Sequence, residues 1–346
     1  GLIQALGHDL SGALQFLPEN TPPSDEPSFE PLASTELEQR LDARKTHDLI
    51  IWNDRPRLTV AGVQDKLTVC VDEMGTLGFG DGSLCSTHVL KFEHERLKHL
   101  VLNEYVSMHI ASMLGLAVAN TRLFTVGEHR ALLVERFDRK REGEKILRRQ
   151  VIDGCQALNL PLEYKYERLF GHGKDVAHIR DGASLSRLFA FAEITSQPDT
   201  TKQRLLDWVI FNALIYNADA HGKNLSFYVE QTGIALAPFY DLVNTAMYTE
   251  LEQNMAMGLG DEFDLHGINA YQWTDFAETC DLSRAVVATR LTALCETLLN
   301  DVFDEPFLDL ANTPEEFAFI KQLFRMIRTR AIHFREQSIQ ILSMEL

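Results

Sequence analysis

Strand-type patterns fill the first half of this chain and helical patterns fill the second half. Short apolar runs that alternate or carry β-branched residues are found at 57–60, 67–71, 88–92, 121–126 and 130–135. A single helical stretch at 95–114 interrupts them. Helical segments follow at 204–217, at 283–300 and from Thr313 onward, where a capping box and a proline open the last helix. This order predicts an α+β fold with two lobes, a β-rich lobe at 1–138 that carries one helix and a helical lobe at 139–346.

The chain is acidic, and this limits the partners that its overall charge can attract. The formal net charge is -17, which argues against a surface that binds nucleic acid or anionic lipid through its overall field. Basic residues gather only between 139 and 149, and we expect this run to be a solvated loop. Membrane binding is therefore not expected, and any link to nucleic acid is expected to be indirect or to come from a part outside this chain.

Cysteine usage and hydropathy both indicate a cytoplasmic protein. The five cysteines are scattered without a Cys-x-x-Cys pair, so they suggest neither a zinc site nor a disulfide framework. No run approaches the roughly 18 to 20 apolar residues that span a bilayer, and no signal segment opens the chain. The sequence begins at Gly1 instead of methionine, which predicts that an N-terminal part of the natural protein is missing.

The stretch 217–228 places several polar side chains between an apolar helix and an apolar strand. Two strand-like runs follow it, 225–229 and 234–239, joined by Gln-Thr-Gly as a plausible hairpin. Antiparallel pairing would bring Asn224, at the entrance of the hairpin, beside Asp241, just past its exit. Their oxygen atoms suit one hard divalent cation, so the sequence predicts a Mg²⁺ site with Asn224 and Asp241 as ligands.

An aspartate followed by an asparagine five residues later and by an aspartate after a hairpin is the arrangement that protein kinases use. Asp219 then becomes the catalytic base for an attacking hydroxyl. Lys91, in a strand, is expected to contact the nucleotide phosphates and to pair with Glu104. That glutamate lies on the inward stripe of the helix at 95–114, where an unpaired charge would be expensive.

The segments around these residues resemble the HipA family of bacterial protein kinases, so the two lobes are expected to form a protein-kinase-like fold. Residues 57–66 look like the phosphate loop of that family, which lacks the Gly-x-Gly-x-x-Gly of eukaryotic kinases. The other segments that resemble it are 87–91, 103–105, 133–138, 155–161 with 165–167, 219–224 and 238–241. They follow one another in family order, and residues 5–14 with Pro18 and Glu19 are similar to the segment that precedes the family's kinase core.

The resemblance implies an ATP site and a regulatory hydroxyl. The residues expected to bind ATP are Ala61, Gly62, Val63, Gln64, Asp65, Lys66, Lys91, Glu104, Glu135, Arg136, Phe137, His221, Lys223, Asn224, Tyr240 and Asp241. Glu135 and Phe137 would hold the adenine through their backbone. Thr59 stands where the family carries a serine that can be autophosphorylated, so it is the expected autophosphorylation position.

The resemblance also implies a toxin that works with an antitoxin. The expected activity is ATP- and Mg²⁺-dependent phosphorylation of a cellular protein, for which an aminoacyl-tRNA synthetase is a candidate, with growth arrest as the result. The expected partner is a small helix-turn-helix antitoxin. Family members usually begin with a small extra subdomain, and none is found here. It was removed, is supplied by a separate protein, or is replaced by another domain.

Two other classes of function stay open. A nucleotide-binding pseudokinase or regulatory module would keep the fold and act through binding, but Lys91, Asp219, Asn224 and Asp241 are all intact. A small-molecule kinase shares the spacing from Asp219 to Asn224 and would favour an acidic pocket for a cationic substrate. The segments at 57–66 and 135–138 favour the HipA resemblance over it.

Overall fold

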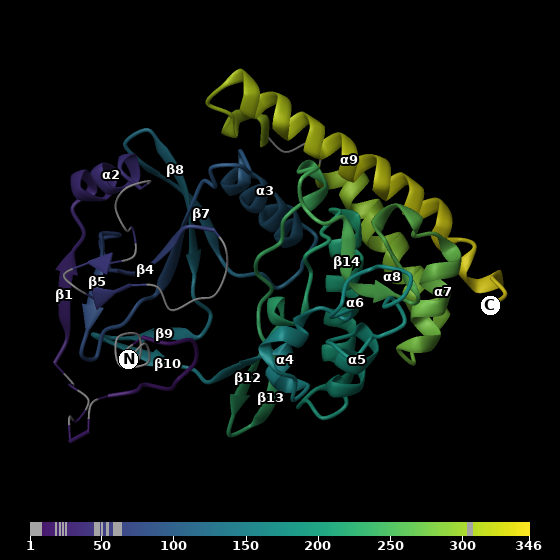
Figure 1. Cartoon of the computed structure of the whole chain (residues 1–346), viewed down its shortest axis with the longest axis horizontal. Helices are drawn as coiled ribbons and strands as arrows, with labels where there is room; N and C mark the ends of the chain where they lie inside the picture. Colours follow the sequence, from purple (N-terminus) through teal and green to yellow (C-terminus); the bar gives the residue numbers. More distant parts are fainter. Residues whose placement is uncertain are drawn as a thin grey trace. The chain divides into compact units, whose positions relative to one another are not determined.

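The computed structural model describes residues 9–17, 19–20, 22, 24, 26–44, 49, 51–52, 55–57, 64–302 and 307–346 (Figure 1). The chain divides into two compact units. Unit 1 comprises Gly1–Tyr105, Ala119–Val151 and Tyr228–Glu230, and unit 2 comprises Val106–Val118, Ile152–Phe227 and Gln231–Leu346. Neither unit is continuous in sequence, because helix α3 and strands β11 and β12 contribute residues to both.

Unit 1 contains an antiparallel six-stranded sheet in the order β1-β5-β4-β6-β8-β7. The strands are β1 (Ser28–Pro31), β4 (Lys66–Val71), β5 (Leu77–Asp81), β6 (His88–Phe92), β7 (Thr121–Val126) and β8 (His129–Glu135). The prediction is confirmed for β4, β6, β7 and β8. The predicted strand at 57–60 lies outside the described residues apart from Arg57, which is not in a strand. Unit 1 also contains two strands of two residues each, β2 (Ile51–Trp52) and β3 (Arg55–Pro56), which pair antiparallel.

Strands β1 and β5 were not predicted. Ser28 and Phe29 of β1 pair with Asp81 and Gly80 of β5. Glycines interrupt the apolar pattern of β5. One of them, Gly78, makes room for β1 beside β5. A Cβ on Gly78 would lie 2.4 Å from the Phe29 ring, so only glycine admits the ring there.

One face of the sheet packs into the core of unit 1. Helix α2 (Ser34–Asp42) places Leu37 and Leu41, four residues apart, on that core and packs against β7 (Figure 1). The sheet residues of this core include Leu67, Val69, Leu90, Phe92, Ala131 and Leu133. Helix α2 went unpredicted because its remaining residues are mostly polar.

Helix α3 (Leu100–Met113) begins five residues later than the predicted start at 95. His99 has a φ of 61°, a left-handed value that a right-handed helix cannot contain. The Glu93 carboxylate caps the new start by accepting a hydrogen bond from the Leu100 amide at 3.0 Å. The inward stripe is as predicted, with Val101, Glu104 and Met108 all buried.

The basic run at 139–149 forms a hairpin instead of the expected solvated loop. Strands β9 (Arg139–Glu142) and β10 (Lys145–Arg148) pair across a turn at Gly143, whose φ is 60°. Several of its cations have acidic or aromatic partners within unit 1. Arg149 donates to the Glu230 carboxylate at 2.6 Å and lies 3.5 Å from the centre of the Tyr228 ring. These partners reduce the positive charge that the run presents to solvent.

A buried ion cluster follows strand β8. The Arg136 guanidinium donates to both Asp138 oxygens, at 3.0 and 2.8 Å, and Arg139 donates to Asp138 at 2.9 Å. Asp9, 3.2 Å from Arg139, adds a second carboxylate. The same arginines bind the carbonyl oxygens of Leu10 and Gly12. The cluster thereby anchors residues 9–13 to the end of β8.

Replacing Asp138 with asparagine is expected to lower the free energy of unfolding of unit 1 by about 3 kcal/mol. An amide carries no charge to balance the two arginines, whose side chains are 5% and 2% exposed, although Asp9 remains beside them. Urea unfolding measures the loss, and hydrogen exchange read by mass spectrometry locates it. Glu142→Gln, which breaks an exposed pair with Lys140, should cost less than about 0.5 kcal/mol. Equal losses in the two variants would contradict the role of the cluster.

The same cluster predicts a loss of stability in acid. Burial by itself would raise the pKa of Asp138, but Arg136 and Arg139 outweigh it and hold the pKa below its ordinary value of 3.8. A lowered pKa in the folded state contributes stability above the pKa of the unfolded state, and this stability is lost as the pH falls through the folded value. Asp138→Asn should therefore flatten the acid limb of the stability profile.

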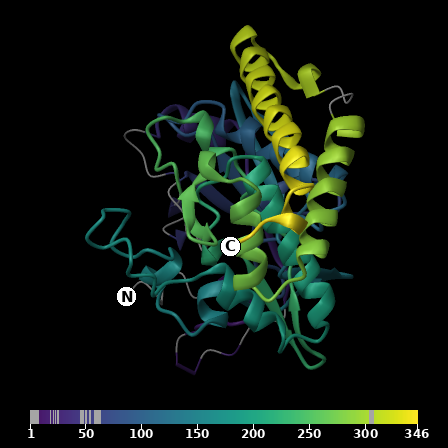
Figure 2. The same ribbon diagram turned by 90° about the vertical axis from the view of Figure 1, so that its right-hand side faces the viewer.

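Unit 2 is mostly helical. Its helices are α4 (Gly154–Ala157), α5 (Leu185–Ala192), α6 (Pro198–Leu214), α7 (Ala270–Thr279), α8 (Arg284–Thr297) and α9 (Pro314–Ser338), with the C-terminal part of α3. Short helical turns are η1 (Leu162–Lys165), η2 (Gly222–Asn224), η3 (Thr245–Met247), η4 (Leu265–Gly267), η5 (Leu298–Val302), η6 (Phe307–Leu310) and η7 (Ile341–Ser343). Helix α9 runs along α8 (Figures 1 and 2). None of the described helices is long and apolar enough to cross a membrane.

The predicted helices of unit 2 are present with shifted ends. Helix α6 begins at Pro198, six residues before the predicted start, because proline is well tolerated in the first turn. The Thr313 side chain caps α9 by accepting from the Glu316 amide at 3.2 Å. The reciprocal half of the predicted capping box differs, since the Glu316 carboxylate accepts from the Asn312 amide at 2.6 Å.

Two small sheets complete the fold. Strands β11 (Val151–Asp153), β12 (Ser226–Glu230) and β13 (Gly233–Leu236) form one sheet in that order, which confirms the predicted hairpin. Strands β14 (Asn254–Leu259) and β15 (Glu262–Asp264) form the other. A β-rich unit that carries the N-terminal part of α3, together with a helical unit, confirms the predicted α+β class.

Candidate functional site

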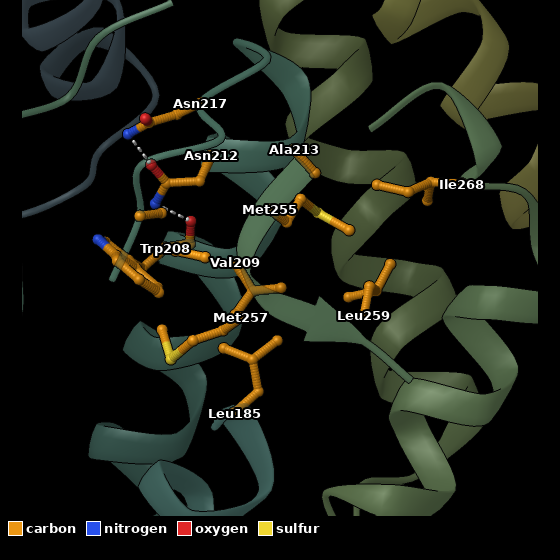
Figure 3. Close-up of a pocket in the computed structure, with 12 residues that line it drawn as sticks. Leu185, Trp208, Val209, Asn212, Ala213, Asn217, Met255, Met257, Leu259 and Ile268 are labelled. Atoms are coloured by element: carbon orange, nitrogen blue, oxygen red, sulfur yellow. Dashed lines mark hydrogen bonds between the residues drawn. The ribbon is translucent and has the colours of Figure 1, made fainter. Parts of the chain in front are cut away.

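The loop that carries Asp219 is fixed by hydrogen bonds at its base. Asn217 donates from its side chain to Asn212 Oδ1 at 2.8 Å, shown as a dashed line in Figure 3, and accepts from the Asp219 amide at 3.1 Å. The Ala218 amide donates to Thr245 Oγ1 at 2.8 Å. Asn217 and Thr245 are both buried, whereas Asp219 is exposed. The loop is rigid where it leaves α6 and presents a carboxylate to solvent.

The turn from Asp219 to Asn224 is held together by hydrogen bonds to the Asp219 carbonyl oxygen. That oxygen accepts from the His221 amide at 2.9 Å and from Asn224 Nδ2 at 2.9 Å. Because the Asn224 amide nitrogen is used in this way, its side-chain oxygen is the atom left for a further interaction. The turn therefore couples the position of Asp219 to that of an oxygen ligand.

Tyr240 ties the segment before Asp241 to the segment around Asn224. Its hydroxyl donates to the Lys223 carbonyl oxygen at 2.7 Å and lies 2.9 Å from Ser226 Oγ. Asp241 itself has a φ of 59°. A left-handed aspartate costs on the order of 1 kcal/mol and persists only where the surrounding structure holds it. Such strain is common at functional sites.

Asn224 and Asp241 suit Mg²⁺ better than they suit zinc. No group of three or more His, Cys, Asp or Glu residues that could hold a metal occurs in the described part of the chain. Mg²⁺ does not require such a cluster, since it is commonly bound by one or two protein oxygens and completes its coordination with waters and substrate phosphates. One amide oxygen and one carboxylate in adjoining segments fit that pattern.

His221 and Lys223 are both engaged by the protein. Burial lowers the pKa of His221, against the opposing influence of Asp219, so the ring is neutral near pH 7. Its Nδ1 has no hydrogen-bond partner among the described atoms. The Lys223 ammonium forms an ion pair with Asp153, the residue that caps α4. Lys223 would have to share or leave Asp153 in order to reach a nucleotide.

Tyr166 is a neighbour of Asp219 that sequence reasoning did not assign to the site. Its hydroxyl donates to Asp219 Oδ1 at 3.0 Å. The only signal in the sequence was its place within 165–167, one of the segments that resemble the HipA family. The two residues are far apart along the chain, so spacing gave no sign that they touch.

Unit 1 carries the predicted ion pair between a strand and a helix. Lys91 on β6 lies 2.6 Å from Glu104 on α3, and their side chains are 12% and 1% exposed. Lys66 on β4 is directly opposite Lys91 in the antiparallel register, so both side chains leave the same face of the sheet. The face that carries the Lys91–Glu104 ion pair therefore also carries Lys66.

The other predicted contacts of unit 1 are only partly described. Thr59, Ala61, Gly62 and Val63 lie outside the described residues. Gln64 Nε2 donates to the Phe92 carbonyl oxygen at 2.7 Å, and the Asp65 carbonyl oxygen accepts from the Phe92 amide at 2.9 Å. These contacts fix the end of the segment that leads into β4.

The segment 135–137 begins at Glu135, the last residue of β8. The Arg136 side chain is committed to the ion cluster and is 6% exposed. Its backbone amide donates to the Thr87 carbonyl oxygen at 2.8 Å, and its carbonyl oxygen accepts from the Arg139 amide at 3.2 Å. The Phe137 carbonyl oxygen accepts from the Tyr228 hydroxyl at 3.0 Å. The Glu135 carboxylate accepts from Asn120 Nδ2 at 2.7 Å.

A small cavity of about 30 Å³ lies within unit 2 (Figure 3), and Asn217 and Ala220 of the loop that carries Asp219 help to line it. Trp208, Asn212, Asn217, Ala220, Met255 and Met257 are among its lining residues. Ligand pockets for drug-sized molecules usually measure about 300–1,000 Å³. This cavity is far too small for a nucleotide, so it is a packing feature of the loop's support.

Comparison with known proteins identifies relatives across most of the chain. Residues 58–302 match the family described as HipA-like C-terminal domain. "Serine/threonine-protein kinase toxin HipA" of Shewanella oneidensis is 42% identical over 299 residues, which are 86% of this chain and 68% of that protein. "Putative kinase Y4mE" of Sinorhizobium fredii is 33% identical over 302 residues, 86% of this chain and 69% of that protein.

Two solved structures resemble the whole fold. A chain of the Shewanella oneidensis HipA, HipB and operator DNA complex superposes with a TM-score of 0.89 at 36% identity, covering 100% of this chain and 80% of that one. The Helicobacter pylori proinflammatory kinase CtkA gives a TM-score of 0.52 at 17% identity, covering 84% of this chain and 96% of that one. The second likeness concerns the fold alone.

Proposed function

Because the chain belongs to the HipA-like family of serine/threonine protein kinases, we propose that it transfers the γ-phosphoryl group of ATP to a hydroxyl of a cellular protein. The observation that carries the proposal is the arrangement in unit 2. One turn joins Asp219 to Asn224, and Tyr240 holds the segment before Asp241 beside it.

Asp219 is the proposed catalytic base. Its carboxylate accepts the proton of the acceptor hydroxyl as the oxygen of that hydroxyl forms a bond to the γ-phosphorus and the bond from that phosphorus to the bridging oxygen of ADP breaks. Its exposure allows a protein side chain to reach it. Asn217 and Asn224 hold the loop, so little reorganisation is needed during the reaction.

Asn224 and Asp241 are the proposed Mg²⁺ ligands. The ion would neutralise the charge that develops on the phosphates. Asn224 is suited to this because its amide nitrogen already binds the Asp219 carbonyl oxygen, which leaves the amide oxygen as a ligand. Its pairing with Asp219 would also keep base and metal ligand at a fixed spacing.

The residues of unit 1 are assigned to the nucleotide by charge and by resemblance. Lys91, oriented by Glu104, and Lys66 on the same face are the proposed phosphate contacts. Backbone groups of Glu135 and Phe137 are proposed to bind the adenine. The remaining proposed ATP contacts are Ala61, Gly62, Val63, Gln64, Asp65, Arg136, His221, Lys223 and Tyr240.

The biological setting is proposed from the relatives. The Shewanella HipA structure contains an antitoxin, HipB, and operator DNA. We propose a similar small DNA-binding antitoxin for this chain, a cytoplasmic location, and an aminoacyl-tRNA synthetase as a substrate whose phosphorylation stops growth. Thr59 is the proposed autophosphorylation position.

Induced expression in a bacterial host tests this function. Wild type should arrest growth and add phosphate to serine or threonine of a small set of host proteins, as read by quantitative phosphoproteomics. Asp219→Asn, made to the same level, should do neither. Growth arrest by the variant equal to that by wild type, with no new phosphorylation in either, would indicate a function through binding instead.

A further inference from the structure

We infer that Tyr166 is a positioning residue for phosphoryl transfer, holding Asp219 Oδ1 so that Oδ2 faces the acceptor hydroxyl. This inference rests on the proposed function and extends it. The hydroxyl of Tyr166 donates to Asp219 Oδ1 at 3.0 Å. A carboxylate that accepts a hydrogen bond at one oxygen is restricted in its rotation, and its other oxygen can still accept a proton.

The phenol remains a donor over the working pH range. Burial raises the pKa of Tyr166, and the adjacent Asp219 carboxylate raises it further. The hydroxyl is therefore protonated near neutral pH. A hydrogen bond from a neutral hydroxyl to a carboxylate is charge-assisted and stronger than one between neutral groups.

Neighbouring side chains fix the ring of Tyr166. The His221 ring meets it edge to face, with centroids 5.4 Å apart and planes at 78°. The Lys165 ammonium lies 4.7 Å from the ring centre, within the range of a cation–π contact. His221 belongs to the same turn as Asp219, so the ring and the carboxylate are held by one local structure.

The backbone on both sides is tied to one residue of β14. The Ala256 amide donates to the Ala218 carbonyl oxygen at 2.7 Å, and the Ala256 carbonyl oxygen accepts from the Glu167 amide at 2.9 Å. Ala218 precedes Asp219, and Glu167 follows Tyr166. A single strand residue therefore sets the spacing between the segments that carry the base and the phenol.

Further contacts keep the Tyr166 segment in place. The buried Glu167 carboxylate accepts from Arg180 Nε at 2.5 Å and from the Gly258 amide at 2.8 Å. A Cβ on Gly182 would lie 1.8 Å from the Tyr166 carbonyl oxygen, so only glycine permits this approach. A tyrosine mounted on so constrained a backbone fits a fixed support better than a gate that must move aside for each substrate.

Tyr166→Phe tests this role because it keeps the ring and removes the hydroxyl. At saturating MgATP, with a bacterial extract as the source of acceptor proteins, the apparent kcat should fall about tenfold, since a hydrogen bond to a charged group contributes that much or more. The KM for ATP and the melting temperature should stay unchanged. Tyr164→Phe, in the same segment, is the matched control and should behave as wild type in all three measurements.

A readout that needs no activity separates this inference from the proposed function. With ¹³C-labelled aspartate, the side-chain carboxyl resonance of Asp219 should move in Tyr166→Phe and stay in place in Tyr164→Phe. A resonance that does not move overturns the contact. An unchanged kcat, or a higher kcat/KM for the acceptor, overturns the positioning role. If the resonance moves but wild type transfers no phosphate, the proposed function fails, and the positioning role fails with it.

Discussion

Replacing Asp219 with asparagine is expected to lower the rate of phosphoryl transfer by about a thousandfold, the usual scale for loss of a general base. Asparagine has nearly the same shape, and the backbone contacts of residue 219 with Asn217, His221 and Asn224 do not involve the carboxylate. The turn should therefore keep its structure. Initial rates of phosphate incorporation at saturating MgATP measure the effect.

Measuring ATP binding shows whether Asp219 acts as a catalytic base or only supports the structure. Asp219→Asn should bind MgATP within about twofold of wild type, because an interaction made only in the transition state lowers kcat without weakening ground-state binding. Asp175→Asn, at an exposed loop position of unit 2, is a matched control and should be fully active. Wild-type activity in Asp219→Asn would remove Asp219 from the role of base.

Replacing Asp241 with asparagine should lower the transfer rate by at least about a hundredfold and should also weaken MgATP binding. The amide has no charge for the metal, so the Mg²⁺ concentration that gives half-maximal activity should rise. The contrast with Asp219→Asn is the informative result, since only the metal ligand should affect nucleotide binding. Titration with Mg²⁺ at fixed ATP, followed by activity and by calorimetry, measures both effects.

Asp281 supplies a control for the unusual backbone of Asp241. Both are aspartates with left-handed φ values, 59° at Asp241 and 51° at Asp281. Asparagine tolerates this conformation at least as well as aspartate, so neither substitution adds strain. Asp281→Asn should therefore leave activity and Mg²⁺ dependence unchanged. A normal Mg²⁺ requirement in Asp241→Asn would contradict its role as a metal ligand.

Local patterns in the sequence predicted the parts of the fold that local physics decides. Strands β4, β6, β7 and β8 have apolar or alternating runs, and the hairpin of β12 and β13 has a turn sequence between two such runs. The pairing of Lys91 with Glu104 was predictable because a carboxylate on an inward helical stripe needs a buried partner.

Features that depend on distant contacts could not be predicted in this way. The hydrogen bond from Tyr166 to Asp219 joins residues 53 positions apart, and the anchoring of Gly12 by Asp138 spans 126 positions. Strand β1 forms because Gly78 admits the Phe29 ring. The basic run at 139–149 looked like a solvated loop because the sequence did not show that Asp9, Asp138 and Glu230 would neutralise it.

The most direct test of the central claim is transfer of label from γ-³²P-ATP by the purified chain in the presence of Mg²⁺ and a bacterial extract. The account predicts label on serine or threonine of one or a few proteins, lost when Mg²⁺ is removed and absent with Asp219→Asn. Label on small molecules alone, or ATP binding without any transfer, would contradict the assignment as a protein kinase.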